Sequence, residues 1–527
     1  MTSGSGGGFQ FRHSNDWQVQ GSYSISLDDG DFSHNVKTGF DFRIWELHRH
    51  YNGNPEASNP FYDIYSDKWG GNLYTLDPDV YERTSKPFRP VKVAAYVQDQ
   101  ISYKGIVFTP GFRIDYFNPN SEYRVDSPYF TSIAADSGFA DVDPKFQVSP
   151  RIMVMYPITE RSQLSLAYGI YFKTPELQNM YDKFYLAELR SGDVLGNPNM
   201  EAQRTNSYQV AYQNQLTDEF VLELSAYYKD IYNQLGVQYY EATPTPFFQY
   251  TVSEYGNAKG IEATFRKLNF NHIGLLLNYT LGYVTGTSNS PLANAGISID
   301  PYTDLPMFPL ATYPQSWDVR HRVSANLDIN WGNNEGPSVG GIQLLENTNF
   351  IFTGNYSSGQ PYTRTDADGT ALSERNSERQ PSYWRVDLRF QKSFALKDWI
   401  GESAGMTSIQ FFVDINNLLN RTAVVALHPA TGDPDNNGRV LEVQVGNFSP
   451  TTFYDKANFA NPTTYAPSQY DAYGRRLYNA KSDFDNNGLV TQAEKFESYQ
   501  NYAEDALSFR GNYQTPRTVY LGVNVRF

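Results

Sequence analysis

Large apolar residues recur at every second position in long stretches of this chain. In residues 164–172 the even positions are large and apolar, whereas the odd positions are mostly small or polar. Successive side chains of a β-strand point to opposite faces, so the pattern predicts a strand with one apolar and one polar face. The same alternation returns at 220–229, 322–331, 384–391 and 518–527. An all-β fold follows.

Three features favour a transmembrane sheet over a dry sandwich. The expected strands are roughly 11–16 residues long, where strands of soluble proteins are usually about 5–6. Their polar faces carry charges of both signs, as a wet lumen would. Aromatic residues stand near strand ends, where membrane girdles form, at Trp17, Tyr116, Tyr156, Tyr283, Trp331 and Trp384.

The lengths of the connections point to the same architecture. The 15 expected strands are 9–27, 33–50, 90–104, 106–118, 145–157, 160–173, 204–214, 219–235, 249–267, 273–286, 318–332, 342–357, 382–395, 406–420 and 516–527. The links after odd-numbered strands are the shorter ones, and most links after even-numbered strands are long: 51–89, 119–144, 174–203, 287–317, 358–381 and 421–515. This alternation predicts an antiparallel transmembrane β-barrel with short periplasmic turns and long extracellular loops.

Composition excludes several other classes. No window holds about 18 continuous apolar residues, so no transmembrane helix is expected. A net charge of −15 argues against a nucleic-acid partner. The absence of cysteine excludes disulfides, thiol catalysis and cysteine-bound metals. With 16% aromatic residues, the chain is not expected to be disordered.

The predicted organisation has three parts. Residues 1–8 are rich in glycine and serine and form a linker or an outer loop. Residues 9–527 form the barrel portion, and 421–515 form a long extracellular loop insertion that contains the segment 483–494. Closed single-chain bacterial barrels have an even number of strands, so 15 strands predict that the chain is the C-terminal part of a longer protein.

Five short segments carry a family resemblance. They resemble, in family order, motifs of the TonB-dependent outer-membrane receptors: AAYVQD at 94–99, GNPNMEAQRT at 196–205, YGNAKGIE at 255–262, FFVDINNLLNR at 411–421, and the terminal Tyr520, Gly522, Val525 and Phe527. The resemblance implies a 22-strand barrel filled by an N-terminal plug that follows a TonB-contacting box. Neither plug nor box is in this chain, whose strands would be the last 15 of the 22. The resemblance extends to receptors of this family that carry an added carboxypeptidase-regulatory-like N-terminal domain.

The resemblance also implies a function. Such a receptor sits in the bacterial outer membrane and takes up a scarce solute, such as an iron chelate, a glycan or a peptide. Its implied partners are the TonB complex, reached through the missing N-terminal region, outer-membrane lipid, a small solute or oligomer, and a surface lipoprotein. No enzymatic activity is implied. Candidate lumen-facing residues, chosen by strand parity, are Glu223, Lys229, Arg322, Asp328, Arg385, Asp387, Arg389, Asp414 and Arg526.

Residues 483–494 fit the 12-residue calcium loop. Gly488 takes the turn position, and the expected ligands are Asp483, Asp485, Asn487, Leu489 through its carbonyl, Thr491 and Glu494. The alternative interpretation is a solvated acidic turn. No entering helix is expected before the loop, so the predicted calcium would stiffen the loop structurally.

Other motifs carry weaker hypotheses. Residues 433–438 begin like a calcium loop, but position 12 is Gln444. Residues 401–405 match the nucleophile elbow around Ser403, yet the required strand-to-helix context is missing. His48 and His50 share a strand face without a third ligand. The aromatic outer loops could bind sugars, peptides or iron chelates, or pack on themselves over the barrel mouth.

Two rival functions remain open at this stage. One is a barrel without transport, acting as an adhesin or a calcium-stabilised surface protein. The other is a secreted hydrolase that uses Ser403. Uptake that requires TonB would separate transport from the first rival, and a Ser403→Ala variant would test the second.

Overall fold

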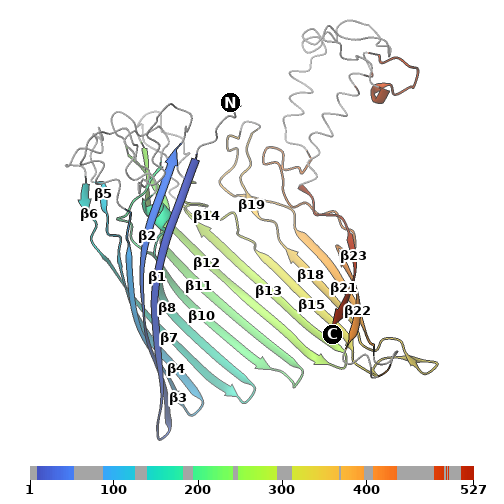
Figure 1. The fold of residues 1–527 in the computed structure, drawn as a ribbon, viewed down its shortest axis with the longest axis horizontal. Helices are drawn as coiled ribbons and strands as arrows, with labels where there is room; N and C mark the ends of the chain where they lie inside the picture. The colour runs from blue at the N-terminus through green and yellow to red at the C-terminus, as the bar shows by residue number, and fades with distance from the viewer. Residues whose placement is uncertain are drawn as a thin grey trace. The chain divides into compact units, whose positions relative to one another are not determined.

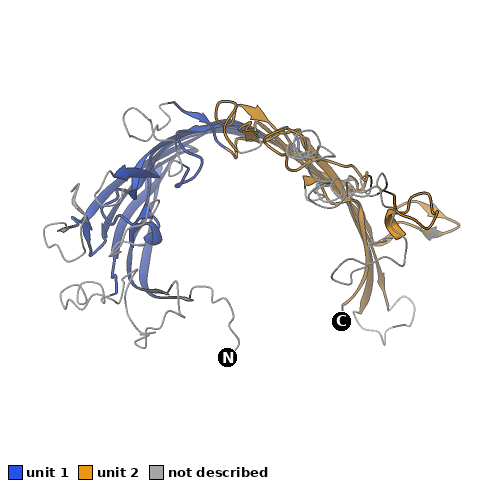
Figure 2. Cartoon of the chain, turned by 90° about the horizontal axis from the view of Figure 1, so that it is seen from above, with its two compact units in different colours: residues 1–264, 281–315 blue, residues 265–280, 316–527 orange. Residues whose placement is uncertain are grey.

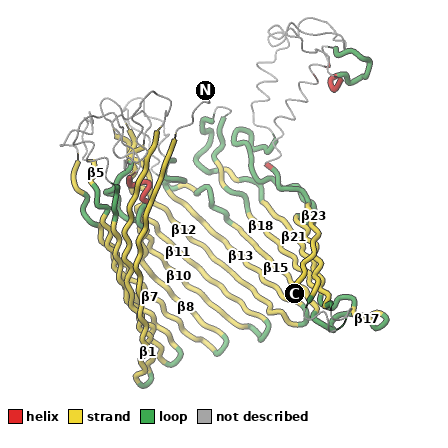
Figure 3. Tube along the Cα trace, in the orientation of Figure 1, coloured by secondary structure: helices red, strands yellow, loops and turns green. Residues whose placement is uncertain are grey.

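The computed structural model describes residues 9–52, 87–124, 139–181, 194–240, 247–293, 311–366, 369–396, 401, 407–435, 480–491, 494, 497 and 512–526. Long strands dominate these residues, with the short helix α2 (Leu177–Tyr181) and the 3₁₀ turn η4 (Ala480–Ser482) among the few helical segments (Figures 1 and 3). No helix in the described residues is long and apolar enough to cross a membrane.

Two compact units make up the chain: residues 1–264 with 281–315, and 265–280 with 316–527 (Figure 2). The first unit holds β1 (Phe9–Asp29), β2 (Phe32–Asn52), β3 (Val91–Tyr103), β4 (Ile106–Asn118), β5 (Glu122–Arg124), β6 (Phe139–Asp141), β7 (Lys145–Thr159), β8 (Ser162–Lys173), α2 (Leu177–Tyr181), β9 (Val194–Leu195), β10 (Gln203–Gln215), β11 (Phe220–Tyr240) and β14 (Tyr313–Pro314). The division between the units passes through β12 (Phe247–Phe270) and β13 (Ile273–Gly286).

The second unit holds β15 (His321–Trp331), β16 (Ser338–Val339), β17 (Ile342–Gln343), β18 (Thr348–Ser357), β19 (Pro361–Tyr362), β20 (Glu378–Arg379), β21 (Tyr383–Ala395), β22 (Ser408–Asn416), the 3₁₀ turn η4 (Ala480–Ser482) and β23 (Thr518–Arg526). Its long strands β15, β18, β21, β22 and β23 pair antiparallel in that order.

In the first unit, β1, β2, β3, β4, β7, β8, β10 and β11 form an antiparallel ladder, each strand pairing with the next. The β1–β2 hairpin pairs without a break from Phe9↔Asn52 to Asp29↔Phe32. The β3–β4 turn is only two residues, Lys104 and Gly105, and both have positive φ. Glycine tolerates that conformation without strain, which favours so tight a hairpin turn.

The period-two sequence pattern becomes two chemically distinct faces. In the first unit, Trp17, Val19, Phe40 and Phe42 share one face and are exposed. In the second unit the alternate residues of β23 behave in the same way, and Leu521 is 77% exposed. In water such a row would be strongly unfavourable, because burying a side chain of this size yields about 1.5–3 kcal/mol. We call this side of each unit the apolar face, and the opposite side the polar face.

A compact apolar cluster lies in the first unit, away from the short turns. Met180 and Tyr181 of α2 are fully buried against Leu47, Phe88 and Phe117. The Phe88 and Tyr181 rings stack with their centroids 4.3 Å apart. The Tyr181 hydroxyl donates to the carbonyl of Pro119 at 2.7 Å. Such contacts fix the chain that follows β8.

All 15 long strands predicted from the sequence are confirmed within the described residues. Three boundaries were wrong by four residues or more. The strand expected at 219–235 continues to Tyr240. The expected strand 342–357 starts at Thr348, because 338–339 and 342–343 form a separate small hairpin. The expected strand 406–420 ends at Asn416, because Asn417 adopts a positive φ of 55°. Residues 1–8 and most of 421–515 lie outside the described part, so the three-part organisation stays a prediction.

Candidate functional site

The polar face of the second unit carries paired charges. Arg385 and Asp387 lie two positions apart on β21 and form an ion pair at 2.9 Å. On the neighbouring strands Arg389 approaches Asp414 at 3.6 Å, and its guanidinium lies 5.1 Å from the centroid of the Phe412 ring. These groups are half-buried or exposed, so their charges are available to a polar solute.

The first unit has a comparable polar face. Arg113 donates two hydrogen bonds of 2.8 Å to the buried carboxylate of Asp115, which Lys92 also approaches at 3.8 Å. A chain of side-chain amides runs across β8, β10 and β11, with Gln163 donating to Gln213 at 2.8 Å and Gln213 donating to Glu223 at 3.2 Å. Strand register places all nine parity-predicted residues on the polar faces.

The GNPN segment is anchored to the wall of the first unit. Asn197 donates its amide to the carbonyl of Tyr250 at 2.9 Å and accepts from the backbone N–H of Asn199 at 3.0 Å. Lys145 binds Asn199 at 2.9 Å and Glu201 at 2.8 Å. The short strand β9, just before this segment, pairs in parallel with β12. The motif therefore packs an outer connection onto the sheet.

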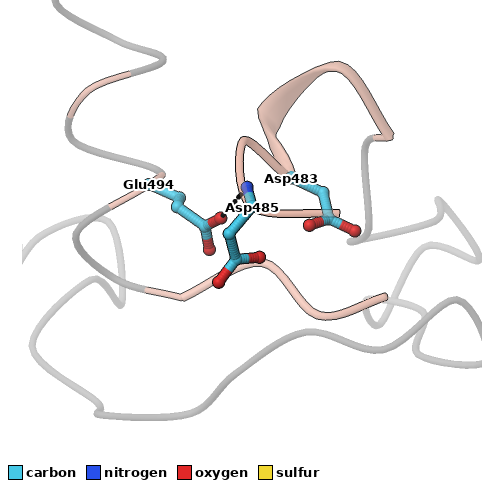
Figure 4. A group of neighbouring side chains, drawn as sticks. All are labelled: Asp483, Asp485 and Glu494. Carbon is cyan, nitrogen blue, oxygen red and sulfur yellow. Dashed lines mark hydrogen bonds between the residues drawn. The ribbon is translucent and has the colours of Figure 1, made fainter. Parts of the chain in front are cut away.

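Three of the six predicted calcium ligands converge in the second unit. Oxygen atoms of Asp483, Asp485 and Glu494 lie within 4.8 Å of one another (Figure 4). Asp483 accepts from the backbone N–H groups of Asn487 and Gly488 at 3.0 and 2.9 Å. Gly488 has a φ of +83°, as the sharp turn of a calcium loop requires. The loop thus brings three carboxylates to one point, where a hard cation would find oxygen ligands.

Glu494 closes the loop through several hydrogen bonds. Thr491 donates its backbone N–H at 2.8 Å and its hydroxyl at 2.7 Å to Oε2, and the backbone N–H of Phe484 donates to Oε1 at 3.0 Å. These donors favour the ionised carboxylate, so they lower the pKa of Glu494 below its ordinary value. Among the other expected ligands, Asn487 donates to Asp485 at 2.7 Å, and the N–H of Leu489 donates to Asn487 at 2.8 Å.

Several sequence candidates lie outside the described residues. Ser403 and Gln444 are among them, and so are the side chains of His48 and His50. Only the first three residues of the second acidic segment, 433–435, are described. Those hypotheses stay untested.

Sequence reasoning missed a polar cluster on the apolar face of the first unit. Asp230 accepts hydrogen bonds from the hydroxyls of Tyr228 and Tyr255 at 3.0 and 2.7 Å, and from the amide of Asn257 at 2.9 Å. Arg204 donates to Asn206 at 3.0 Å on the adjacent strand. The sequence pattern could have revealed this cluster. Even positions on these two strands otherwise carry mostly apolar residues, and the exceptions include Arg204, Asn206 and Asp230.

Long antiparallel strands with an exposed apolar face and a charged opposite face define an outer-membrane β-barrel protein. The family model described as "TonB dependent receptor-like, beta-barrel" matches residues 2–418. The chain belongs to the TonB-dependent receptor β-barrel family, and its location is the outer membrane. No curated protein matches the chain.

Solved structures of receptors resemble this chain. The outer membrane transporter YddB from Escherichia coli has 12% identity and a TM-score of 0.51, covering 79% of this chain and 52% of its own. A ferric enterobactin receptor mutant (PfeA) from Pseudomonas aeruginosa has 13% identity and a TM-score of 0.49, with coverages of 78% and 50%. The Serratia marcescens hemophore receptor HasR has 13% identity and a TM-score of 0.48, with coverages of 79% and 57%. The chain therefore spans about half the length of these structures.

Proposed function

We propose that this chain is the barrel portion of a receptor that takes up a scarce solute across the outer membrane with energy from TonB. The observation that carries the proposal is the family match over 2–418, combined with charged polar faces such as the Arg389–Asp414 pair. An iron chelate, a glycan and a peptide all present polar groups that such a surface can bind. The proposal assigns the protein no catalytic reaction and no nucleic-acid partner.

The proposed partners follow from the mechanism. The TonB complex would act through a plug and a TonB box in an N-terminal region that this chain does not contain. Outer-membrane lipid would surround the apolar face, and a surface lipoprotein could help to capture a large solute. The barrel's own part is to provide a polar path and an outer capture surface.

Uptake by living cells tests the transport proposal. The complete natural polypeptide is expressed in a receptor-deficient strain, with and without TonB, and labelled ferric siderophores, oligosaccharides and oligopeptides are offered in turn. We expect one class to accumulate only when TonB is present. Accumulation that ignores TonB, or no accumulation of any class, would favour the alternative of an adhesin or a surface structural protein.

We also infer that residues 483–494 bind one structural calcium ion. The inference is supported by the match of sequence positions to the calcium loop and by the convergence of Asp483, Asp485 and Glu494. Asn487, Thr491 and the carbonyl of Leu489 would complete an oxygen shell. Calorimetric titration of the metal-stripped natural polypeptide with calcium tests this directly. A solvated acidic turn would release no heat above the buffer control.

A further inference from the structure

A groove of about 480 Å³ hollows the apolar face of the first unit across β7, β8, β10 and β11. Strand register explains it. One row across these strands, level with Leu166, holds Val154, Leu166, Val210 and Ala226. The row next to it, level with Tyr168, holds Ile152, Tyr168, Tyr208 and Tyr228, and the row on the other side holds Tyr156, Leu164, Tyr212 and Leu224. The groove is lined by the Leu166 row and the Tyr168 row, where the short side chains of Val154, Val210 and Ala226 lie beside the bulky tyrosines.

The tyrosine row forms a continuous wall along this groove. The ring centroids of Tyr168 and Tyr208 are 5.0 Å apart, and those of Tyr208 and Tyr228 are 6.2 Å apart. Beyond that wall lies the polar cluster, because Asn206 pairs with Asp230 one row further along the strands. The groove and the cluster are therefore parts of one surface.

Position along the strands sets the depth of each part in the bilayer. Asn206 pairs with Ile170, eight residues from the start of β8 at Ser162. Eight residues at about 3.4 Å, on strands tilted by about 40°, rise about 21 Å from the periplasmic turn. The apolar band of such barrels is about 25 Å tall, so the cluster lies near its outer boundary. Leu166 is only four residues from Ser162, so the groove reaches toward the middle of the bilayer.

The polar cluster presents groups that suit a phosphorylated sugar. Arg204 is exposed and offers a guanidinium, which binds phosphate well. The three donors to Asp230 all use Oδ1. Within the described residues no donor occupies Oδ2, which can accept from a sugar hydroxyl or an amide. A charge is costly on a lipid-facing surface, and such groups usually mark a functional site.

We propose that this surface binds one outer-leaflet glycolipid of the lipid A type, a phosphorylated and acylated disaccharide. The phosphate lies on Arg204, sugar or amide donors lie on Asp230 and Asn206, and one acyl chain occupies the groove below the tyrosine row. The cluster's place at the outer boundary and its mixed charge select this occupant. A phospholipid with a simple anionic headgroup would use Arg204 but would bring no donor to Oδ2 of Asp230.

Lipid retained by the purified protein tests the proposal. The complete natural polypeptide and its variants are extracted from native outer membranes, washed with detergent, and analysed for glycolipid per protein by mass spectrometry. Ala226→Leu fills the groove, and Arg204→Gln removes the phosphate ligand. We expect each to lower retained glycolipid by about tenfold, as the loss of one charge-assisted contact or one seated chain would.

Two matched controls change the same residue types elsewhere. Ala95→Leu adds bulk on the apolar face of β3, and Arg161→Gln removes an exposed charge in the β7–β8 turn. Both should retain the wild-type amount. Folding of each variant is checked by comparing the gel migration of heated and unheated samples. If Ala226→Leu does not fold, the result for Arg204→Gln decides the test.

Several outcomes would overturn the proposal. If all four variants retained the same amount of glycolipid, the lipid would be non-specific annular lipid around the barrel. If phosphatidylglycerol vesicles displaced the glycolipid as well as vesicles of the glycolipid itself do, the site would bind any anionic lipid. Dissociation of an oligomer in Ala226→Leu without loss of lipid would assign the groove to a second copy of the chain.

Discussion

The side-chain amide of Asn417 donates a 3.1 Å hydrogen bond to the backbone carbonyl of Thr515, 98 residues further along the chain. The same amide donates to the carbonyl of Arg421 at 2.9 Å, and its oxygen accepts from the N–H of Arg421 at 2.9 Å. Asn417 is 2% exposed. One buried residue therefore joins the two ends of the connection between β22 and β23.

Replacing Asn417 by alanine should destabilise the folded barrel by about 2–4 kcal/mol, because three hydrogen bonds made by one buried side chain would be lost. Thermal or urea unfolding in detergent measures the change. Asn524→Ala is the matched control, since Asn524 is exposed and makes a single 3.4 Å hydrogen bond to Gln410. An equal loss in both variants would contradict the role given to Asn417.

Gly359 should not tolerate even one added carbon. A Cβ there would lie 1.5 Å from the backbone oxygen of Gln380, so Gly359→Ala must push the β19–β20 segment away and disturb the bond from Arg379 to the carbonyl of Gly359. We expect a loss of about 3 kcal/mol in unfolding free energy. At Gly354 the nearest atom would be 3.9 Å away, so Gly354→Ala should cost less than about 1 kcal/mol. Similar unfolding midpoints for the two variants would refute the steric argument.

Calcium binding should depend on Glu494 and not on its neighbour. Glu494→Gln removes the closing carboxylate, and we expect calcium affinity to fall at least about tenfold by calorimetry. Glu497→Gln changes an exposed acid of the same type three positions later and should bind as the unmodified chain does. If both variants bind equally, the ion is not held by this loop.

The calcium-free loop should lose protection in acid. The donors to Glu494 hold its pKa below the ordinary 4.5, so the folded loop favours the ionised carboxylate. That stabilisation is complete above about pH 4.5 and disappears as the pH falls through the lowered pKa. Hydrogen exchange at the amides of Phe484 and Thr491, corrected for intrinsic rates, should accelerate in this range. Glu494→Gln should show no such transition, and an identical acid response in that variant would exclude Glu494 as its origin.

The long strands could be predicted because their evidence is local: each alternates over its own length, as β8 and β23 do. The calcium-loop hypothesis rests on equally local evidence, since its residues all lie within 12 positions. The burial of Met180 and Tyr181 could not be predicted, because it depends on contacts with Leu47, Phe88 and Phe117 from distant segments. The small hairpin at 338–343 was missed for a related reason: two-residue strands are too short to show a period.

The unbroken β1–β2 hairpin is much longer than a membrane crossing requires. A barrel strand needs about 9–11 residues to span the bilayer, whereas each of these strands has 21. About half of the hairpin must therefore stand clear of the lipid as a stiff ribbon. With the turn at Gly30 and Asp31 on the periplasmic side, the end of the hairpin farthest from that turn would project beyond the outer lipid headgroups.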